Sequence, residues 1–204
     1  MNNRILTLLL LVGVVFSGIA LVPRLKSYHL PGNQQGYEPT QPIAFSHRLH
    51  AGELQISCMY CHSGAETSRH AGIPATSVCM NCHKSVTASS GALRENPKEI
   101  SPELRKLYDS FGLDEKLEKK KTPHPIPWVR VHNLPDFTKF DHRAHVNSGV
   151  ACQKCHGPVE TMERVRQVES LSMGWCVNCH REVNTSGVQG KKVHASLDCA
   201  ACHY

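Results

Sequence analysis

The chain has 204 residues, with ten cysteines, 14 histidines and a formal net charge of +6. This length allows one domain or two small ones. Apolar residues make up 40% of the chain and aromatic residues 6%, which is little material for a conventional core. The high cysteine and histidine content excludes a disordered chain. An apolar N-terminal segment and the arrangement of the cysteines argue against a purely soluble cytosolic enzyme.

The apolar segment runs from Ile5 to Val22 and carries no charge over 18 residues. A helix of this length would span about 27 Å, close to the thickness of the hydrocarbon core of a bilayer. It predicts either a membrane anchor or a signal peptide that is cleaved after Ala20. The length of the segment favours the anchor, so we expect a transmembrane helix within residues 1–22. Residues 23–44 are then a tether, and the rest of the chain lies outside the cytoplasm.

The cysteines are the strongest signal, because all ten fall in five copies of one motif, C-x-x-C-H. The motifs are Cys58, Cys61 and His62; Cys79, Cys82 and His83; Cys152, Cys155 and His156; Cys176, Cys179 and His180; and Cys199, Cys202 and His203. This spacing is the attachment signature of c-type haem. Each cysteine forms a thioether to one haem vinyl group, and the histidine becomes a ligand of the iron. The sequence therefore predicts five covalent haems c.

Zinc sites and disulfides are the alternatives for paired cysteines in an exported protein. A zinc protein has no reason to place a histidine after every pair, and five pairs do not divide evenly into sites of four cysteines. Five disulfides across two-residue gaps would be strained and would close only very small loops. Both alternatives are therefore much weaker than haem attachment.

Five haems would also explain the composition. They would form most of the core of a chain that has few large apolar residues. We therefore expect a mostly α-helical and irregular fold with little regular secondary structure and the haems at its centre. The haem propionates would offset the basic charge, so we expect no nucleic-acid partner.

The chain repeats itself. Residues 45–62 and 140–156 each begin with Phe-x-His-Arg-x-His, continue through a short spacer and end in C-x-x-C-H. One further motif follows in the first half and two follow in the second half. This pattern predicts a dihaem module over residues 45–90 and a trihaem module over residues 140–204.

Residues 91–139 differ from both modules. Ser101, Pro102 and Glu103 are a typical helix start, and Gly112 can end the helix. Apolar residues recur with helical spacing between them, at Leu104, Leu107, Tyr108 and Phe111. A run of lysines and a proline-rich stretch follow. We expect a surface helix and an extended connector, with a docking site for a partner as the alternative.

Each iron also needs a sixth ligand or an open position. The candidates are the repeated pairs His47 with His50 and His142 with His145, followed by His70, His132 and Met173. Histidines three residues apart on a helix share one face and can serve two neighbouring haems. Methionine ligation would raise the reduction potential of its haem. The alternative for each candidate is an ordinary surface histidine or a packing methionine.

The Phe-x-His-x-x-His pattern before C-x-x-C-H resembles the class III cytochromes with three or four haems. That resemblance implies that His47 serves the haem of His62 and that His142 serves the haem of His156. It also implies that His50 and His145 serve the haems of His83 and His180.

Longer stretches resemble the membrane-anchored pentahaem cytochrome c subunits of alternative complex III. They include HAGIPATSVCMNCH (70–83), PWVRVHNLPDF (127–137), FDHRAHVNSGVACQKCHGPVE (140–160) and SMGWCVNCHRE (172–182). This resemblance implies a bacterial inner-membrane location with the haem domain on the periplasmic side. It implies iron–sulfur and polytopic quinol-binding subunits as partners, and a monohaem cytochrome c or an oxidase as acceptor. The multihaem subunit of a related quinone reductase complex is similar but carries six haems in that family.

Three functions are compatible with a protein that carries these motifs. An electron-transfer subunit without a catalytic site is favoured, because every motif ends in histidine and candidate distal ligands outnumber the irons. A multihaem reductase of a small molecule such as nitrite would need an iron with an open position. A soluble periplasmic carrier would require cleavage of the N-terminal segment.

Overall fold

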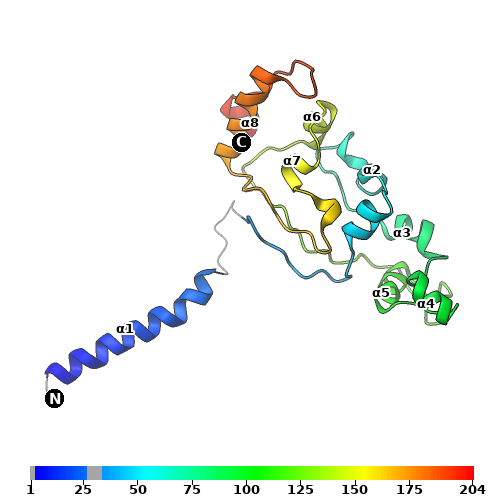
Figure 1. Cartoon of the computed structure of the whole chain (residues 1–204), viewed down its shortest axis with the longest axis horizontal. Helices are drawn as coiled ribbons and strands as arrows, with labels where there is room; N and C mark the ends of the chain where they lie inside the picture. The colour runs from blue at the N-terminus through cyan, green and yellow to red at the C-terminus, as the bar shows by residue number, and fades with distance from the viewer. Residues whose placement is uncertain (1–2, 27–33) are drawn as a thin grey trace.

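The computed structural model of the protein describes residues 3–26 and 34–204, and Figure 1 shows its path. It is helical and irregular, as predicted. Helix α1 covers Asn3–Lys26. The first module holds the π-helical turn η1 (Arg48–Glu53), α2 (Cys58–Cys61), the 3-10 turn η2 (Ser63–Ala65) and α3 (Thr76–His83), and α4 (Ser90–Glu95) follows. After α5 (Pro102–Phe111) come α6 (His142–Asn147), α7 (Gln153–His156), the 3-10 turn η3 (Val159–Thr161), α8 (Met173–Ser186) and α9 (Cys199–Cys202).

Within the two described ranges the strand pairing is limited to isolated bridges, such as Thr138 with His203 and Val188 with Lys191. The motif helices differ in length, from four residues in α2, α7 and α9 to 14 residues in α8. Their caps are local: the side chains of Ser57, Ser172 and Asp198 accept hydrogen bonds from the first turns of α2, α8 and α9.

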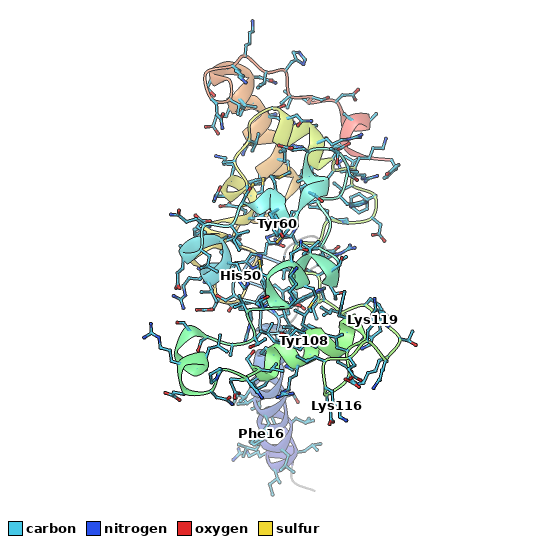
Figure 2. All side chains as sticks on the ribbon, turned by 90° about the vertical axis from the view of Figure 1, so that its right-hand side faces the viewer. Phe16, His50, Tyr60, Tyr108, Lys116 and Lys119 are labelled. Atoms are coloured by element: carbon cyan, nitrogen blue, oxygen red, sulfur yellow. The ribbon has the colours of Figure 1, made fainter. Side chains whose placement is uncertain are left out.

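The apolar N-terminal segment forms helix α1, and the apolar side chains described in it are exposed. Leu8 is 62% exposed and Phe16, labelled in Figure 2, is 74% exposed. Among the residues that the structure describes, however, no helix combines the length and the hydropathy needed to cross a membrane. The predicted transmembrane helix is therefore not found. The side chains of the last predicted residues, 20–22, and the predicted tether residues 27–33 lie outside the described part.

Helix α5 begins and ends as predicted. The Ser101 hydroxyl accepts a hydrogen bond from the Leu104 N–H, Pro102 opens the helix, and Gly112 follows it with a φ of 91°. A side chain at Gly112 would be strained at this φ and would collide with the Lys121 carbonyl. The helix is more than a surface element, because Leu107 and Tyr108 are buried with Ile43 in the main apolar cluster of the described residues.

That apolar cluster is small. In the described ranges the buried hydrophobic residues are Ile43, Ala65, Leu107, Tyr108, Val131 and Met162. Three of the six gather around α5, at the end of the domain that also holds α3 and α4 (Figure 1). The segments that carry the first, third, fourth and fifth motifs thus lack an apolar core of their own, as expected if haem supplies that core.

The two modules are joined by polar and backbone contacts. The Arg48 N–H donates to the Met162 carbonyl at 2.9 Å, and the Arg48 guanidinium forms ion pairs with Glu53 and Glu163. The η1 and η3 turns approach so closely that a side chain at Gly52 would collide with the Glu160 carbonyl. Farther along, Arg69 Nε donates to the Phe140 carbonyl at 2.9 Å.

Candidate haem-binding site

The two Phe-x-His-x-x-His segments fold almost alike. Phe45 stacks on His50 with ring centres 4.3 Å apart, and Phe140 stacks on His145 at 4.7 Å. The other histidine of each pair meets the same phenylalanine edge-on, His47 and His142 both at 4.9 Å. The repeated phenylalanine therefore fixes both imidazoles of its pair. The structure thus places the four most strongly predicted distal histidines in two equivalent frames.

Three histidine pairs face one another with a spacing that fits an iron between them. The ring centres are 6.1 Å apart for His50 and His83, 6.1 Å for His145 and His180, and 6.4 Å for His142 and His156. Two imidazoles that bind one metal ion from opposite sides, through bonds of about 2 Å, have ring centres about 6 Å apart. Each pair joins one predicted distal histidine to one motif histidine.

Backbone carbonyl groups select the tautomer of these rings. Among the motif histidines, Nδ1 lies 2.7 Å from the Gly72 oxygen in His62, 2.8 Å from the Val86 oxygen in His83 and 2.6 Å from the Ser196 oxygen in His180. Among the distal candidates the same atom lies 2.8 Å from the Ser46 oxygen in His50, 2.9 Å from the Arg69 oxygen in His142 and 2.9 Å from the Asp141 oxygen in His145. Nδ1–H donates in each case, which leaves the Nε2 lone pair for a metal.

His47 and His156 are partly buried, and their pKa values are strongly lowered. Burial, together with nearby His62 and His50, lowers the pKa of His47 to about 4. Burial and four neighbouring histidines lower the pKa of His156 to about 3. Both rings are therefore neutral at pH 7, as an iron ligand must be. His47 Nδ1 is buried and has no hydrogen-bond partner.

The three weaker distal candidates lie in different surroundings. His132 is partly buried and its Nε2 has no partner, but its ring centre is only 4.3 Å from that of His156. The two rings are too close to bind one iron from opposite sides, so His132 fits only a different iron. His70 is exposed, and Met173 is 67% exposed. Iron ligation by His70 or Met173 stays a prediction.

All ten cysteines are free thiols in the structure, and none is fully buried. Within residues 3–26 and 34–204 no group of three or more His, Cys, Asp or Glu side chains could hold a metal ion by itself. The donors are instead spread as five thiol pairs, each next to a histidine, and three of these histidines, His83, His156 and His180, face a second histidine across a gap. This donor set fits c-type haem, with the thiols holding the porphyrin and the histidines its iron.

Sequence reasoning missed the residues that orient these ligands. The carbonyl groups of Gly72, Val86 and Ser196 have no sequence signature, because any residue supplies the same oxygen. The Tyr108 hydroxyl donates to the His83 carbonyl at 2.5 Å and so ties the second motif to α5. The sequence indicates Tyr108 only as one of the apolar positions with helical spacing.

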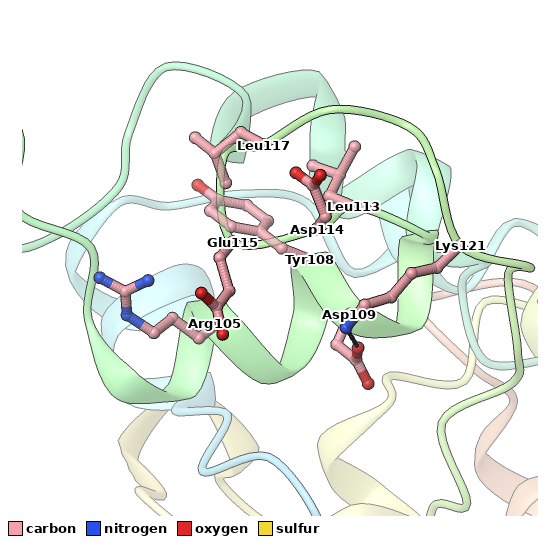
Figure 3. A pocket seen from close by; sticks show the side chains of 8 residues that line it. All are labelled: Arg105, Tyr108, Asp109, Leu113, Asp114, Glu115, Leu117 and Lys121. Carbon is pink, nitrogen blue, oxygen red and sulfur yellow. Dashed lines mark hydrogen bonds and ion pairs between the residues drawn. The ribbon is translucent and has the colours of Figure 1, made fainter.

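The structure also contains one small pocket away from the motifs, between α5 and the loop that follows it (Figure 3). It encloses about 170 Å³, and the ion pair between Lys121 and Asp109 at 2.5 Å lies at its edge. Its lining holds no cysteine or histidine. The pocket is therefore separate from the haem-binding residues.

Two comparisons bear on this arrangement. The family model described as "Cytochrome c7 and related cytochrome c" matches residues 43–99 and 138–204, which is more than half of the chain. The multiheme cytochrome c subunit of menaquinone reductase from Nitratidesulfovibrio vulgaris is 26% identical over 183 residues. That alignment covers 80% of this chain and 76% of the relative.

Proposed function

Because the chain belongs to the family of cytochrome c7 and related c-type cytochromes, we propose that it is the electron-transfer subunit of a quinone-linked membrane complex, with five covalent haems. The observation that carries this proposal is the set of three facing histidine pairs at 6.1 to 6.4 Å. A haem with two histidine ligands has no open position for a substrate. The arrangement thus favours electron relay over small-molecule reduction.

When bound, c-type haem supplies one-electron exchange between ferrous and ferric iron. The chain's own residues do the rest. The cysteines would hold each porphyrin through thioether bonds, and the histidines facing His83, His156 and His180 would each supply a second ligand to an iron. The carbonyl groups at Nδ1 hold the rings in one orientation, which limits rearrangement when an iron changes its charge.

The related subunit from N. vulgaris favours a quinone reductase complex as the setting. Electrons would then pass from a periplasmic cytochrome through this chain to quinone-binding subunits. The second candidate is an alternative complex III, in which flow runs from quinol to a monohaem cytochrome c or an oxidase. It is favoured by the five motifs of this chain, because the quinone reductase subunits that it resembles carry six haems.

The test uses the purified complex and two assays. In a quinone reductase the complex oxidises a reduced periplasmic cytochrome and reduces a menaquinone analogue. In an alternative complex III it oxidises the quinol and reduces the cytochrome. Intact mass of the subunit should show five haems, each adding about 616 Da to the chain. A chain without covalent haem would refute the proposal in both forms.

We also propose that the exposed apolar side chains of α1 help to hold the complex at the periplasmic face of the inner membrane. Replacing residues 1–22 with a cleavable signal should yield a haem-loaded protein that high salt or mild detergent releases more readily. The control is the same signal placed before the complete chain. Unchanged tight binding after the replacement would show that partner subunits alone hold it.

A further inference from the structure

The five motifs could be arranged as a cluster or as a line, and their contacts distinguish the two. Hydrogen bonds and ring contacts join each motif, or a segment next to it, to a neighbouring motif. The inference rests on the proposed function, since it concerns the haems that these motifs would carry.

The first and second motifs are in direct contact. Asn81, inside the second motif, donates through Nδ2 to the Tyr60 hydroxyl inside the first motif at 2.9 Å. The turn η1 leads into the first motif, yet its His50 faces His83 of the second.

The first and third motifs meet across the boundary between the modules. The turn η1 leads into the first motif and packs on η3, which follows the third motif, since the Arg48 N–H donates to the Met162 carbonyl at 2.9 Å. The approach is close enough that a side chain at Gly52 would collide with the Glu160 carbonyl. Asn147, at the end of α6, donates to the Glu66 carbonyl at 3.2 Å just after the first motif.

Helix α6 joins the third motif to the fourth. Its His142 faces His156 and its His145 faces His180, so one short helix serves both motifs.

The fourth and fifth motifs are joined through the loop between them. His180 Nδ1 donates to the Ser196 carbonyl at 2.6 Å, three residues before Cys199. Asn184 of α8 exchanges two hydrogen bonds with Ala195, at 2.9 Å and 2.7 Å.

From these contacts we infer that the five haems form one line in the order second, first, third, fourth, fifth motif. Figure 1 supports the two ends, since α3 lies beside α4 and α5 at one end of the domain and α8 lies at the other. The order along the line differs from the order in the sequence. The second motif stands at one end, and the first motif stands between the second and the third. Electrons would be exchanged with partners at the α3 end and the α9 end, one at a time and without a change in covalent bonds.

The order predicts which haems sense one another. In the purified, haem-loaded chain, nuclear magnetic resonance of the haem methyl groups through a redox titration reports how reduction of one haem changes the equilibrium of each other haem. The signals are assigned through contacts with nearby side chains such as Tyr60 and Asn81. The four strongest interactions should join the second to the first, the first to the third, the third to the fourth and the fourth to the fifth motif.

Two exposed lysines provide matched charge changes. Lys84 follows the second motif, and Lys154 lies inside the third. Lys84→Glu should favour the ferric state at the second motif by about fivefold, with a smaller effect at the first and the least at the fourth and fifth. Lys154→Glu should act most on the third motif, equally on its neighbours the first and fourth, and least on the second and fifth. Both changes are at the surface and leave every ligand in place.

The haem content of the chain is measured first, and it tests the proposed function. A chain with five haems whose second motif interacts most strongly with the third, fourth or fifth keeps the proposed function and overturns the order. The order is also overturned if Lys154→Glu acts more on the ends of the line than on the first and fourth motifs. The predicted gradients in both variants would establish it.

Discussion

The two Phe-x-His-x-x-His segments carry the same residues in the same frame but anchor their histidines differently. His142 Nδ1 donates to the Arg69 carbonyl of the other module at 2.9 Å, whereas Nδ1 of the equivalent His47 is buried without a partner. His50 and His145, in contrast, both donate to the carbonyl four residues earlier. The hydrogen bonds within each Phe-x-His-x-x-His segment are thus the same in both copies, and the hydrogen bonds from the segment to other parts of the chain differ. We expect the first histidine of each pair to behave differently and the second to behave alike.

The largest expected effect comes from removing the second histidine of either pair. His145→Ala should leave every haem attached but remove one axial ligand, so that one haem becomes high-spin and binds carbon monoxide when reduced. His50→Ala should do the same to the haem of the second motif. Optical and electron paramagnetic resonance spectra measure both changes.

The exposed His194 is the control for both variants, and His194→Ala should keep all haems low-spin. A His145→Ala protein that stays fully low-spin and binds no carbon monoxide would show that His145 is not a ligand. The matched result for His50 tests the first module separately. If only one of the two variants became high-spin, the two Phe-x-His-x-x-His segments would not be equivalent in iron ligation.

Arg69 should matter for the second module more than for the motif that precedes it. Its side chain donates to the Phe140 carbonyl at 2.9 Å and to the Tyr204 hydroxyl at 2.8 Å. Arg69→Ala removes both bonds and should lower the free energy of unfolding by about 2 kcal/mol. Denaturant unfolding measures this loss, and the exposed Arg164→Ala is the control. Equal losses in the two variants would show that Arg69 is an ordinary surface arginine.

A smaller effect is expected from Tyr60→Phe, which removes the hydrogen bond from Asn81 and keeps the ring. Because Tyr60 is 48% exposed, the free energy of unfolding should fall by about 0.5 kcal/mol. The exposed Tyr204 offers a matched Tyr204→Phe variant that cuts a bond between the modules instead. A loss for Tyr60→Phe larger than for Arg69→Ala would reverse the ranking of these contacts.

The sequence predicted what depends on local pattern. The motifs, the repeat, the bounds of α5 and the helical, irregular fold class follow from spacing and capping residues. The role of α5 as the apolar centre was not predicted, because its partner Ile43 lies 64 residues before Leu107. The Nδ1 acceptors were not predictable either, since a carbonyl oxygen is the same for every residue type. Recognising the crowding of His132 against His156 also required the tertiary structure.

The smallest expected effect concerns the residue after the repeated phenylalanine, which is Ser46 in the first module and Asp141 in the second. Asp141 caps α6, and its carboxylate accepts hydrogen bonds from the Arg143 N–H at 2.9 Å and from the Arg143 guanidinium at 2.6 Å. Arg143 thereby lowers the pKa of Asp141 below the usual 3.8. The stabilisation is therefore complete above pH 3.8 and is lost as the pH falls through the lowered value. At the equivalent position the Ser46 hydroxyl does not titrate, but together with Arg48 it lowers the pKa of the Glu163 carboxyl below its usual value.

Acid titration followed by the haem spectra can separate the two modules on this basis. In the intact protein, the two haems should be perturbed at different pH values, because the segment with His145 loses the charged Asp141 cap and the segment with His50 loses the Glu163 contacts with Ser46 and Arg48. Asp141→Ser should remove the acid step from the haem served by His145 alone, and Asp141→Asn, which keeps a side-chain cap, should do so without weakening α6 at pH 7. The shift is small, since Asp141 and Arg143 are solvated and their ion pair is screened. If Asp141→Ser left the difference unchanged, its cause would lie instead in the first histidine of each pair, where His142 has the Arg69 carbonyl and His47 has no acceptor.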